Sequence, residues 1–67
     1  MSTESVTIRR MTLLDVDQVH AIEARTFTEA WSHQSFVDEM EKNKCARYLV
    51  AEEDGRVLAY AGAWLVF

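Results

Sequence analysis

The sequence predicts an α/β chain of the α+β type, in which a strand, two helices and a β-hairpin build a mainly antiparallel sheet. Three observations predict this class: an alternating segment near the start, two segments that open with helix-capping residues, and an Asp54-Gly55 pair between two strand-like runs. Of the 67 residues, 49% are hydrophobic and 27% are charged. This is the composition of a globular chain, so disorder of the whole segment is excluded.

The first predicted strand is the segment VTIRRM, Val6 to Met11, because apolar and polar side chains alternate along it. In this interpretation, Val6 and Ile8 face the core of the domain. The residues before the strand, 1–5, are polar, and we expect them to be disordered.

A first helix is predicted over residues 13–26. Thr12 is a suitable N-cap, because its hydroxyl can accept a hydrogen bond from a free first-turn amide and Asp15 can complete a capping box. At about 100° per residue, the apolar residues of this helix share one broad side. His20 and Glu23 fall on that same side, and we interpret His20 as a packing histidine.

A second helix is predicted from its N-cap, Ser32, to a stop near Asn43, a residue that tolerates the left-handed conformation found at helix ends. Trp31 precedes the cap and Phe36 occupies the fourth helical position. These are the two positions of a hydrophobic staple. His33 follows the cap and is expected to be exposed.

The segment RYLVAEEDGRVLAYAG predicts a β-hairpin, since Asp-Gly between two strand-like runs favours a type I′ turn. A two-residue loop would place Glu53 opposite Arg56, Ala51 opposite Leu58, and Leu49 opposite Tyr60. Tyr48 and Tyr60 are interpreted as wall residues on these strands.

The last run, Val57 to Phe67, is apolar on both faces, which is typical of a strand inside a sheet. Natural sheet edges are usually protected by charge, proline or a covering element, and this run has none of these. We therefore interpret residues 1–67 as a single partial domain, truncated before a further strand. If the chain is complete, the alternative is a non-enzymatic homodimer that pairs through Val57–Phe67.

Charge and composition exclude several classes of partner. The formal net charge of −4 argues against nucleic acid, because binding to a phosphate backbone needs clustered Lys and Arg. The apolar run is too short for a membrane span of about 20 residues, and the start MSTES does not resemble a signal peptide. One cysteine, Cys45, cannot form an intramolecular disulfide, and with two histidines it makes no zinc pattern. We expect a cytoplasmic protein without a metal.

Three stretches resemble the GNAT (acyl-CoA N-acyltransferase) superfamily: IRRMTLLDVDQV, IEARTFTEAWS and VAEEDGRVLAYAG. Together they span almost the whole chain. The first and third are widespread in the superfamily, whereas the second is most similar to the RimI-like ribosomal-protein alanine N-acetyltransferases. Two positions depart from the pattern, since Ala30 stands where that group usually has proline and Ala59 where it usually has glycine. The resemblance implies the N-terminal half of a GNAT domain.

The resemblance also implies an activity, namely acetyl transfer from acetyl-CoA to the α-amine of a peptide, with a ribosomal protein as the expected acceptor. The family binds the pyrophosphate on a loop of the form Q/R-x-x-G-x-G/A at a helix N-terminus. Gly55 lies in a turn and Gly62 within a strand, so neither can serve. The catalytic carboxylate and tyrosine of the family are also expected beyond Phe67. The chain alone is expected to be inactive, and an acetyltransferase for small amines remains an alternative.

By the same resemblance, acceptor recognition is expected in the loop between the helices. Glu29 matches a loop glutamate of related N-terminal acetyltransferases and is the candidate to bind or deprotonate the amine. The alternative is an ordinary solvated acid. Phe27 and Trp31 are candidate substrate-binding residues, although Phe27 also suits the core and the staple alone explains Trp31.

Glu23 is the fourth candidate, because a charge on the apolar side of a helix is costly to bury without a partner. It either reaches the substrate groove or pairs with one of the arginines at positions 9, 10 and 47. The sequence leaves these alternatives open.

Overall fold

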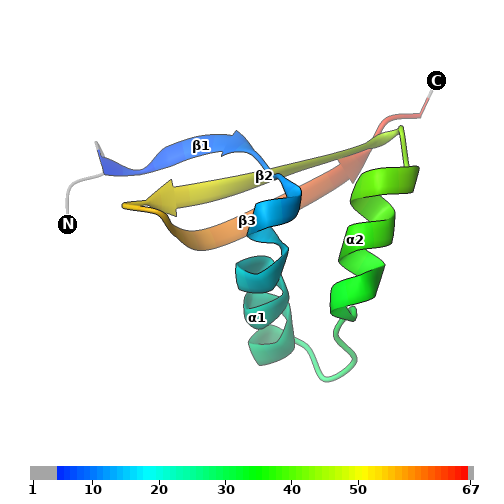
Figure 1. The fold of residues 1–67 in the computed structure, drawn as a ribbon, viewed down its shortest axis with the longest axis horizontal. Helices are drawn as coiled ribbons and strands as arrows, with labels where there is room; N and C mark the ends of the chain where they lie inside the picture. The colour runs from blue at the N-terminus through cyan, green and yellow to red at the C-terminus, as the bar shows by residue number, and fades with distance from the viewer. Residues whose placement is uncertain (1–4, 67) are drawn as a thin grey trace.

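The computed structural model describes residues 5–66 (Figure 1). The elements in chain order are β1 (Thr7–Arg10), a short 3-10 turn (Leu13–Asp15), α1 (Val16–Thr26), α2 (His33–Lys42), β2 (Ala46–Glu53) and β3 (Arg56–Trp64). The predicted class and element order are confirmed. Residues 1–4 and Phe67 lie outside the described residues, so the expectations made for them stay open. The Ser5 hydroxyl donates to Glu53 Oε2 at 2.5 Å.

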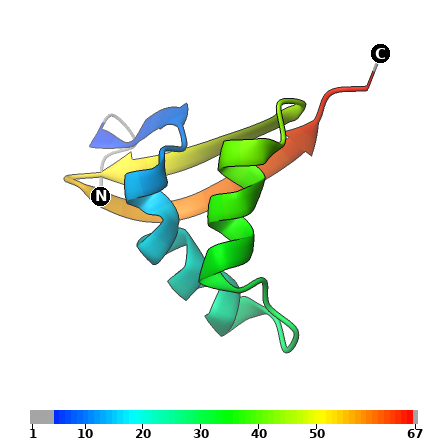
Figure 2. The same cartoon turned by 45° about the vertical axis from the view of Figure 1, so that its right-hand side comes forward.

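The three strands form one antiparallel sheet in the order β1-β2-β3. Both helices pack on the same face of this sheet (Figures 1 and 2). The opposite face carries no helix within residues 5–66 (Figure 2). Leu49 is exposed on that face, since its neighbour Val50 is buried towards the helices. Neither helix of the described chain is long and apolar enough to cross a membrane.

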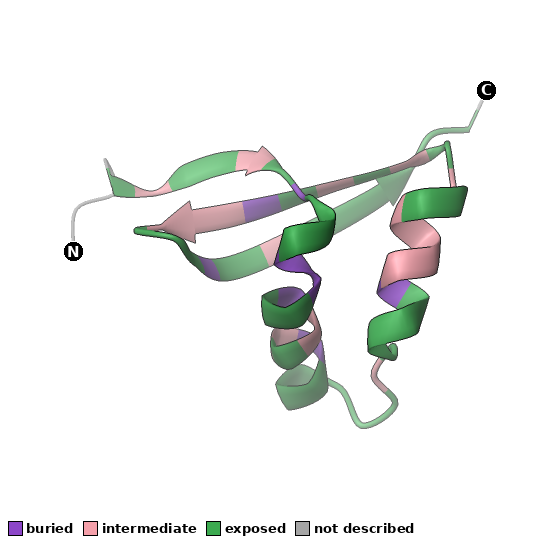
Figure 3. Cartoon of the chain, viewed as in Figure 1, coloured by how far each residue is buried: buried purple, intermediate pink, exposed green. Residues whose placement is uncertain are grey.

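The core lies between the helices and the sheet (Figure 3). Its buried apolar side chains come from the residue after β1, from the start of α1, from α2 and from the two hairpin strands: Met11, Val16, Val19, Phe36, Val50 and Val57. The predicted apolar side of the first helix is only partly buried, because Leu13, Ala24 and Phe27 are exposed. Leu13 belongs to the 3-10 turn, whose tighter pitch rotates it off the α-helical face. Phe27 has extended backbone after the helix has ended.

The predicted start of the second helix is confirmed, whereas Thr12 precedes a 3-10 turn and α1 itself begins at Val16. Asp15 accepts from the Thr12 backbone N–H at 2.7 Å, and Ser32 Oγ accepts from the Ser35 backbone N–H at 3.1 Å. The first turn after Thr12 is 3-10 rather than α, because the Asp15 N–H bonds to the Thr12 carbonyl at 3.0 Å. The second helix ends as predicted, but Asn43 is extended and not left-handed.

The first strand presents the opposite face from the one predicted. Ile8 is 64% exposed, because it pairs with Ala51 on the face without helices. Arg9 points to the helix side instead, where it binds the carboxylates of Asp15 and Glu52. Met11 follows on that same side and is buried. The alternation of this segment was identified correctly, but an arginine and a methionine, not Val6 and Ile8, face the helices.

The hairpin turn is confirmed and the predicted register is wrong beyond it. Asp54 and Gly55 both have positive φ, as a type I′ turn requires, and Glu53 lies opposite Arg56. Glu52 then faces Val57, but Ala51 faces Ala59, which leaves Leu58 without an opposite residue. This is a β-bulge. Because of it, Tyr60 lies opposite Val50, on the helix side, rather than opposite Leu49.

Candidate functional site

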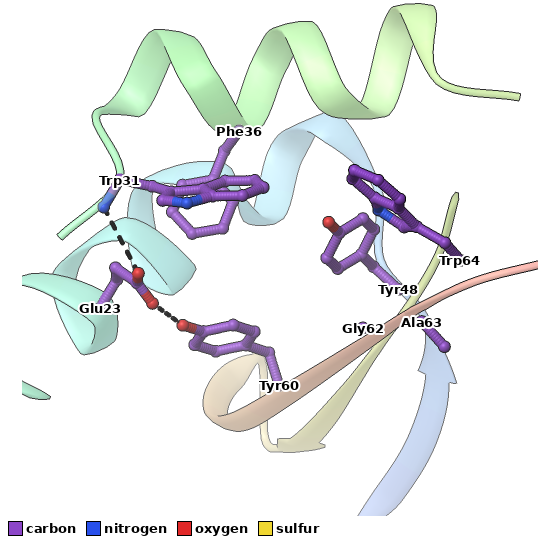
Figure 4. Close-up of a pocket in the computed structure, with 8 residues that line it drawn as sticks. All are labelled: Glu23, Trp31, Phe36, Tyr48, Tyr60, Gly62, Ala63 and Trp64. Atoms are coloured by element: carbon purple, nitrogen blue, oxygen red, sulfur yellow. Dashed lines mark hydrogen bonds between the residues drawn. The ribbon is translucent and has the colours of Figure 1, made fainter. Parts of the chain in front are cut away.

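A cavity of about 510 Å³ opens between α1, α2 and the last strand (Figure 4). We call it the aromatic cavity, and its lining residues are Glu23, Trp31, Phe36, Tyr48, Tyr60, Gly62, Ala63 and Trp64. Its volume lies within the range of about 300–1,000 Å³ that is usual for small-molecule sites. Every element of the fold except β1 and the 3-10 turn supplies part of its lining, together with the loop between the helices.

Glu23 is a buried carboxylate at one end of the aromatic cavity, with 8% of its surface exposed. Its Oε1 accepts from the Trp31 backbone N–H at 3.4 Å, and its Oε2 accepts from the Tyr60 hydroxyl (Figure 4). Of the two alternatives left open for Glu23, pairing with an arginine is wrong, because within residues 5–66 Glu23 has no salt bridge. Glu23 therefore joins α1, the helix–helix loop and β3 through neutral donors.

Aromatic rings form the wall beside Glu23. Trp31 packs on Phe36 with ring centroids 5.3 Å apart, and Phe36 meets Tyr60 edge to face at 6.0 Å. The predicted staple between Trp31 and Phe36 is thus confirmed. Trp31 also lines the aromatic cavity, so its packing role and a contact with a ligand are compatible.

The other side of the aromatic cavity is organised by Glu39 of α2. Its Oε2 accepts from the Tyr48 hydroxyl at 2.8 Å and from Trp64 Nε1 at 2.7 Å, while its Oε1 accepts from Asn43 Nδ2 at 3.1 Å. Partial burial opposes ionisation, but the three hydrogen bonds outweigh it and lower the pKa of Glu39 below its usual value. Burial, followed by the hydrogen bond to Glu39, raises the pKa of Tyr48. Glu39 thus fixes two rings of the lining.

Gly62 provides the space that the Tyr48 ring occupies. The two residues lie opposite each other in the hairpin, and a Cβ at Gly62 would approach within 2.6 Å of Tyr48 Cδ1. This is closer than real Cβ contacts come. A glycine at this position therefore lets the tyrosine lie flat across β3.

The structure brings two of the four predicted site residues into the aromatic cavity. Glu23 and Trp31 line it, while Phe27 and Glu29 do not. Phe27 is 55% exposed, so its interpretation as a core residue is wrong. Glu29 is exposed in the loop between the helices.

Sequence analysis missed Phe36, Gly62 and Trp64 as lining residues, and Glu39 as the acceptor that holds Tyr48 and Trp64. The regular spacing of Tyr60, Gly62 and Trp64 at alternate positions was the available signal. This spacing shows that the three residues share one face of the strand, but only the bulge determines that this face is the one towards the helices.

The two histidines lie close together, which sequence analysis did not predict. Their rings meet edge to face at 6.0 Å, and His33 Nε2 is 2.7 Å from Asp17 Oδ1. His33 is exposed, as expected. The part of the chain that the structure describes holds no group of three His, Cys, Asp or Glu side chains that could bind a metal ion.

The order of strand, two helices and hairpin, with both helices on one face of an antiparallel sheet, defines the chain as part of a GNAT-like domain, as the sequence predicted. An integron cassette protein from the mobile metagenome of V. cholerae has the same arrangement, with a TM-score of 0.62 over 94% of this chain and 45% of that chain. Its sequence is 23% identical, so this likeness concerns the fold alone.

The resemblance to RimI-like enzymes is confirmed by a curated relative. The chain is 46% identical over 59 residues to a Bacillus subtilis (strain 168) protein named "Putative ribosomal protein bS18-alanine N-acetyltransferase". The match covers 88% of this chain and 39% of that relative, so the chain spans well under half of the relative's length. Comparison with models of protein families gives no match.

Proposed function

We propose that the chain is the substrate-side portion of a protein N-terminal acetyltransferase, which transfers acetyl from acetyl-CoA to the α-amine of a peptide. The observation that carries this proposal is the 46% identity to a relative whose name gives alanine N-acetyltransferase activity. The acceptor would be the N-terminus of a protein, with a ribosomal protein as the first candidate. The acidic chain and its single free thiol, Cys45, support a cytoplasmic protein that binds neither nucleic acid nor membrane.

In this reaction the neutral amine attacks the thioester carbonyl, the C–N bond forms, and the C–S bond breaks to release CoA. The amine must lose a proton, which a base accepts. Glu29, in the exposed loop, is our candidate for holding or deprotonating the incoming amine, and Phe27 and Trp31 for contacts with the peptide.

Acetyl-CoA would be the co-substrate, and the described residues do not fit its pyrophosphate. Gly55 sits in the hairpin turn with φ +80° and Gly62 sits in β3, so neither glycine opens a helix. We therefore propose that residues 1–67 form one partial domain, and that the cofactor loop and the catalytic acid belong to another part of the enzyme.

A chimera tests this function. The segment of the Bacillus subtilis relative that matches this chain is replaced by the chain, and acetylation of an alanine-starting peptide is compared with acetylation of small primary amines. We expect the chimera to acetylate the peptide and the 67-residue chain alone to show no turnover. In the chimera, Glu29→Gln should lower kcat/KM about tenfold or more, while Glu41→Gln, an exposed acid of α2, should not.

The parent relative serves as the positive control, and circular dichroism verifies that the chimera is folded. A folded chimera without turnover, beside an active parent, would contradict the proposed function. Turnover of small amines in preference to the peptide would support the alternative, an acetyltransferase for small amines.

One observation favours a second candidate, the non-enzymatic homodimer. In the described sheet β3 pairs on one side only, and Trp64, Leu65 and Val66 at its end are exposed. Sedimentation of the 67-residue chain over a range of concentrations tests this candidate. A folded monomer at all concentrations would exclude it.

A further inference from the structure

We propose that the aromatic cavity binds an alkylammonium group, so that the acceptor amine enters in its charged form between the rings and Glu23 and loses its proton to a base, for which Glu29 is the candidate, before it attacks the thioester. The identity of the amine as a peptide N-terminus rests on the proposed function. The binding itself does not, because it follows from the charge and the lining of the aromatic cavity.

The first argument is unbalanced charge. Glu23 is buried, and both of its hydrogen-bond partners, the Trp31 amide and the Tyr60 hydroxyl, are neutral. Buried carboxylates are normally paired with a cation, because an uncompensated charge is costly to remove from water. The described residues supply no such cation to Glu23. A ligand cation in the aromatic cavity would complete the site.

A second carboxylate strengthens the same argument. Glu39 takes its hydrogen bonds from Tyr48, Trp64 and Asn43, all neutral donors, and two of these side chains line the aromatic cavity. The nearby Lys42 is paired with Asp38 at 3.3 Å instead. Glu23 in the lining, and Glu39 behind the lining residues Tyr48 and Trp64, therefore both lack an ion-pair partner within residues 5–66.

The third argument is the aromatic composition of the cavity wall. Five of the lining residues are aromatic: Trp31, Phe36, Tyr48, Tyr60 and Trp64 (Figure 4). The faces of aromatic rings carry negative electrostatic potential and attract organic cations, which aromatic cages use to bind ammonium groups. The picture shows Trp31, Phe36 and Tyr60 on the side of Glu23, with Tyr48 and Trp64 across from them. A cation between these groups would contact rings from both sides.

The same features exclude the other partner of the reaction. The pyrophosphate of acetyl-CoA is an anion, and two carboxylates without counter-ions would repel it. The volume of about 510 Å³ is larger than one ammonium group requires, so the first residue of an acceptor can enter with its amine. The occupant that fits is therefore the acceptor and not the acetyl donor.

Tryptophan fluorescence of the 67-residue chain tests this proposal directly, since the two tryptophans of the sequence both line the aromatic cavity. The probes are alanine methylamide and tetramethylammonium, with N-acetylalanine methylamide and tert-butanol as uncharged controls. We expect saturable changes with the two cations and none with the controls. Glu23→Gln should weaken binding of both cations about tenfold or more.

The matched control is Glu41→Gln, which removes the same charge from an exposed position outside the lining and should change affinity less than about twofold. If Glu23→Gln does not fold, the comparison of charged and uncharged probes on the unsubstituted chain still decides. Equal binding of alanine methylamide and its acetylated form, or no binding of either cation, would overturn the proposal.

The outcome is independent of the test of the proposed function. Cation binding with an inactive chimera would leave this inference standing and remove the acetyltransferase. An active chimera, together with no cation binding by the 67-residue chain, would support the acetyltransferase function and overturn this inference.

Discussion

Protonation of Asp15 should remove a defined part of the stability of the fold. The Arg9 guanidinium binds this carboxylate with two hydrogen bonds, Nη1 to Oδ2 at 2.8 Å and Nη2 to Oδ1 at 2.7 Å. The Thr12 backbone N–H donates a third, at 2.7 Å. Asp15 is buried, so these contacts are shielded from water and salt. The perturbation is acidification, in parallel with the substitution Asp15→Asn.

The magnitude follows from the pKa of this group. The hydrogen bonds from Arg9, with those from Thr12 and against the effect of burial, lower the pKa of Asp15 from 3.8 to about 2. At about 1.4 kcal/mol per pKa unit, the shift corresponds to about 2 kcal/mol of folding free energy. Because the folded state binds the proton less tightly than the unfolded state, this contribution is complete above about pH 5. It is lost as the pH falls through 3.8 towards 2.

Urea unfolding followed by circular dichroism at pH 6, 4 and 2 measures this effect. At pH 6 Asp15→Asn should be less stable than the unsubstituted chain by about 2 kcal/mol, and the difference should shrink to a few tenths at pH 2. Asp54→Asn, in the exposed turn, is the control and should leave the pH dependence unchanged. A difference between Asp15→Asn and the unsubstituted chain that is the same at all three pH values would refute the reasoning.

Three further substitutions have defined expectations in the same unfolding assay. Gly62→Ala should cost about 1–3 kcal/mol, because the added Cβ meets the Tyr48 ring, and Gly62→Ala combined with Tyr48→Ala should recover part of the loss. Gly55→Ala should cost about 1–2 kcal/mol, since φ is +80° there, while Gly55→Asn should cost less. Ser32→Ala should cost about 1 kcal/mol through loss of the cap on Ser35, whereas Ser32→Asp should not. A loss of less than about 0.3 kcal/mol in the free energy of unfolding, for Gly62→Ala, Gly55→Ala or Ser32→Ala, would contradict the structural role given to that residue.

Local signals predicted most of the fold. The caps at Thr12 and Ser32 and the Asp54-Gly55 turn each depend on neighbouring residues, so the sequence contains the whole of their physics. The same holds for the staple of Trp31 on Phe36, whose partners are close neighbours in the sequence on either side of the helix start.

Long-range features were predicted less well. The strand that contains Ile8 has apolar residues on both faces, so alternation alone could not decide which face meets the helices. The partner of Glu23 was expected among the arginines, but Tyr60 reaches it instead, because the bulge turns Tyr60 towards α1. Arg9 was unavailable, since Asp15 and Glu52 already bind it.

Part of the candidate site was predicted, namely Glu23 and Trp31 as binding residues and Tyr48 and Tyr60 as wall residues. Trp31 and Glu23 lie in the segment that carried the family resemblance, and both line the aromatic cavity. The remaining lining residues come from β2, β3 and α2. Their convergence depends on how the hairpin packs on the helices, which no local pattern encodes.

The bulge at Leu58 makes the spacing between Gly55 and Tyr60 part of the site. Near the turn, odd-numbered Val57 of β3 faces the helices, whereas beyond Leu58 the even-numbered Tyr60, Gly62 and Trp64 do. A regular register, with Leu58 opposite Ala51, would instead turn the alanines at positions 59, 61 and 63 towards the helices and the two aromatic side chains away from them. The one unpaired residue between the turn and Tyr60 therefore decides which side chains of β3 line the aromatic cavity.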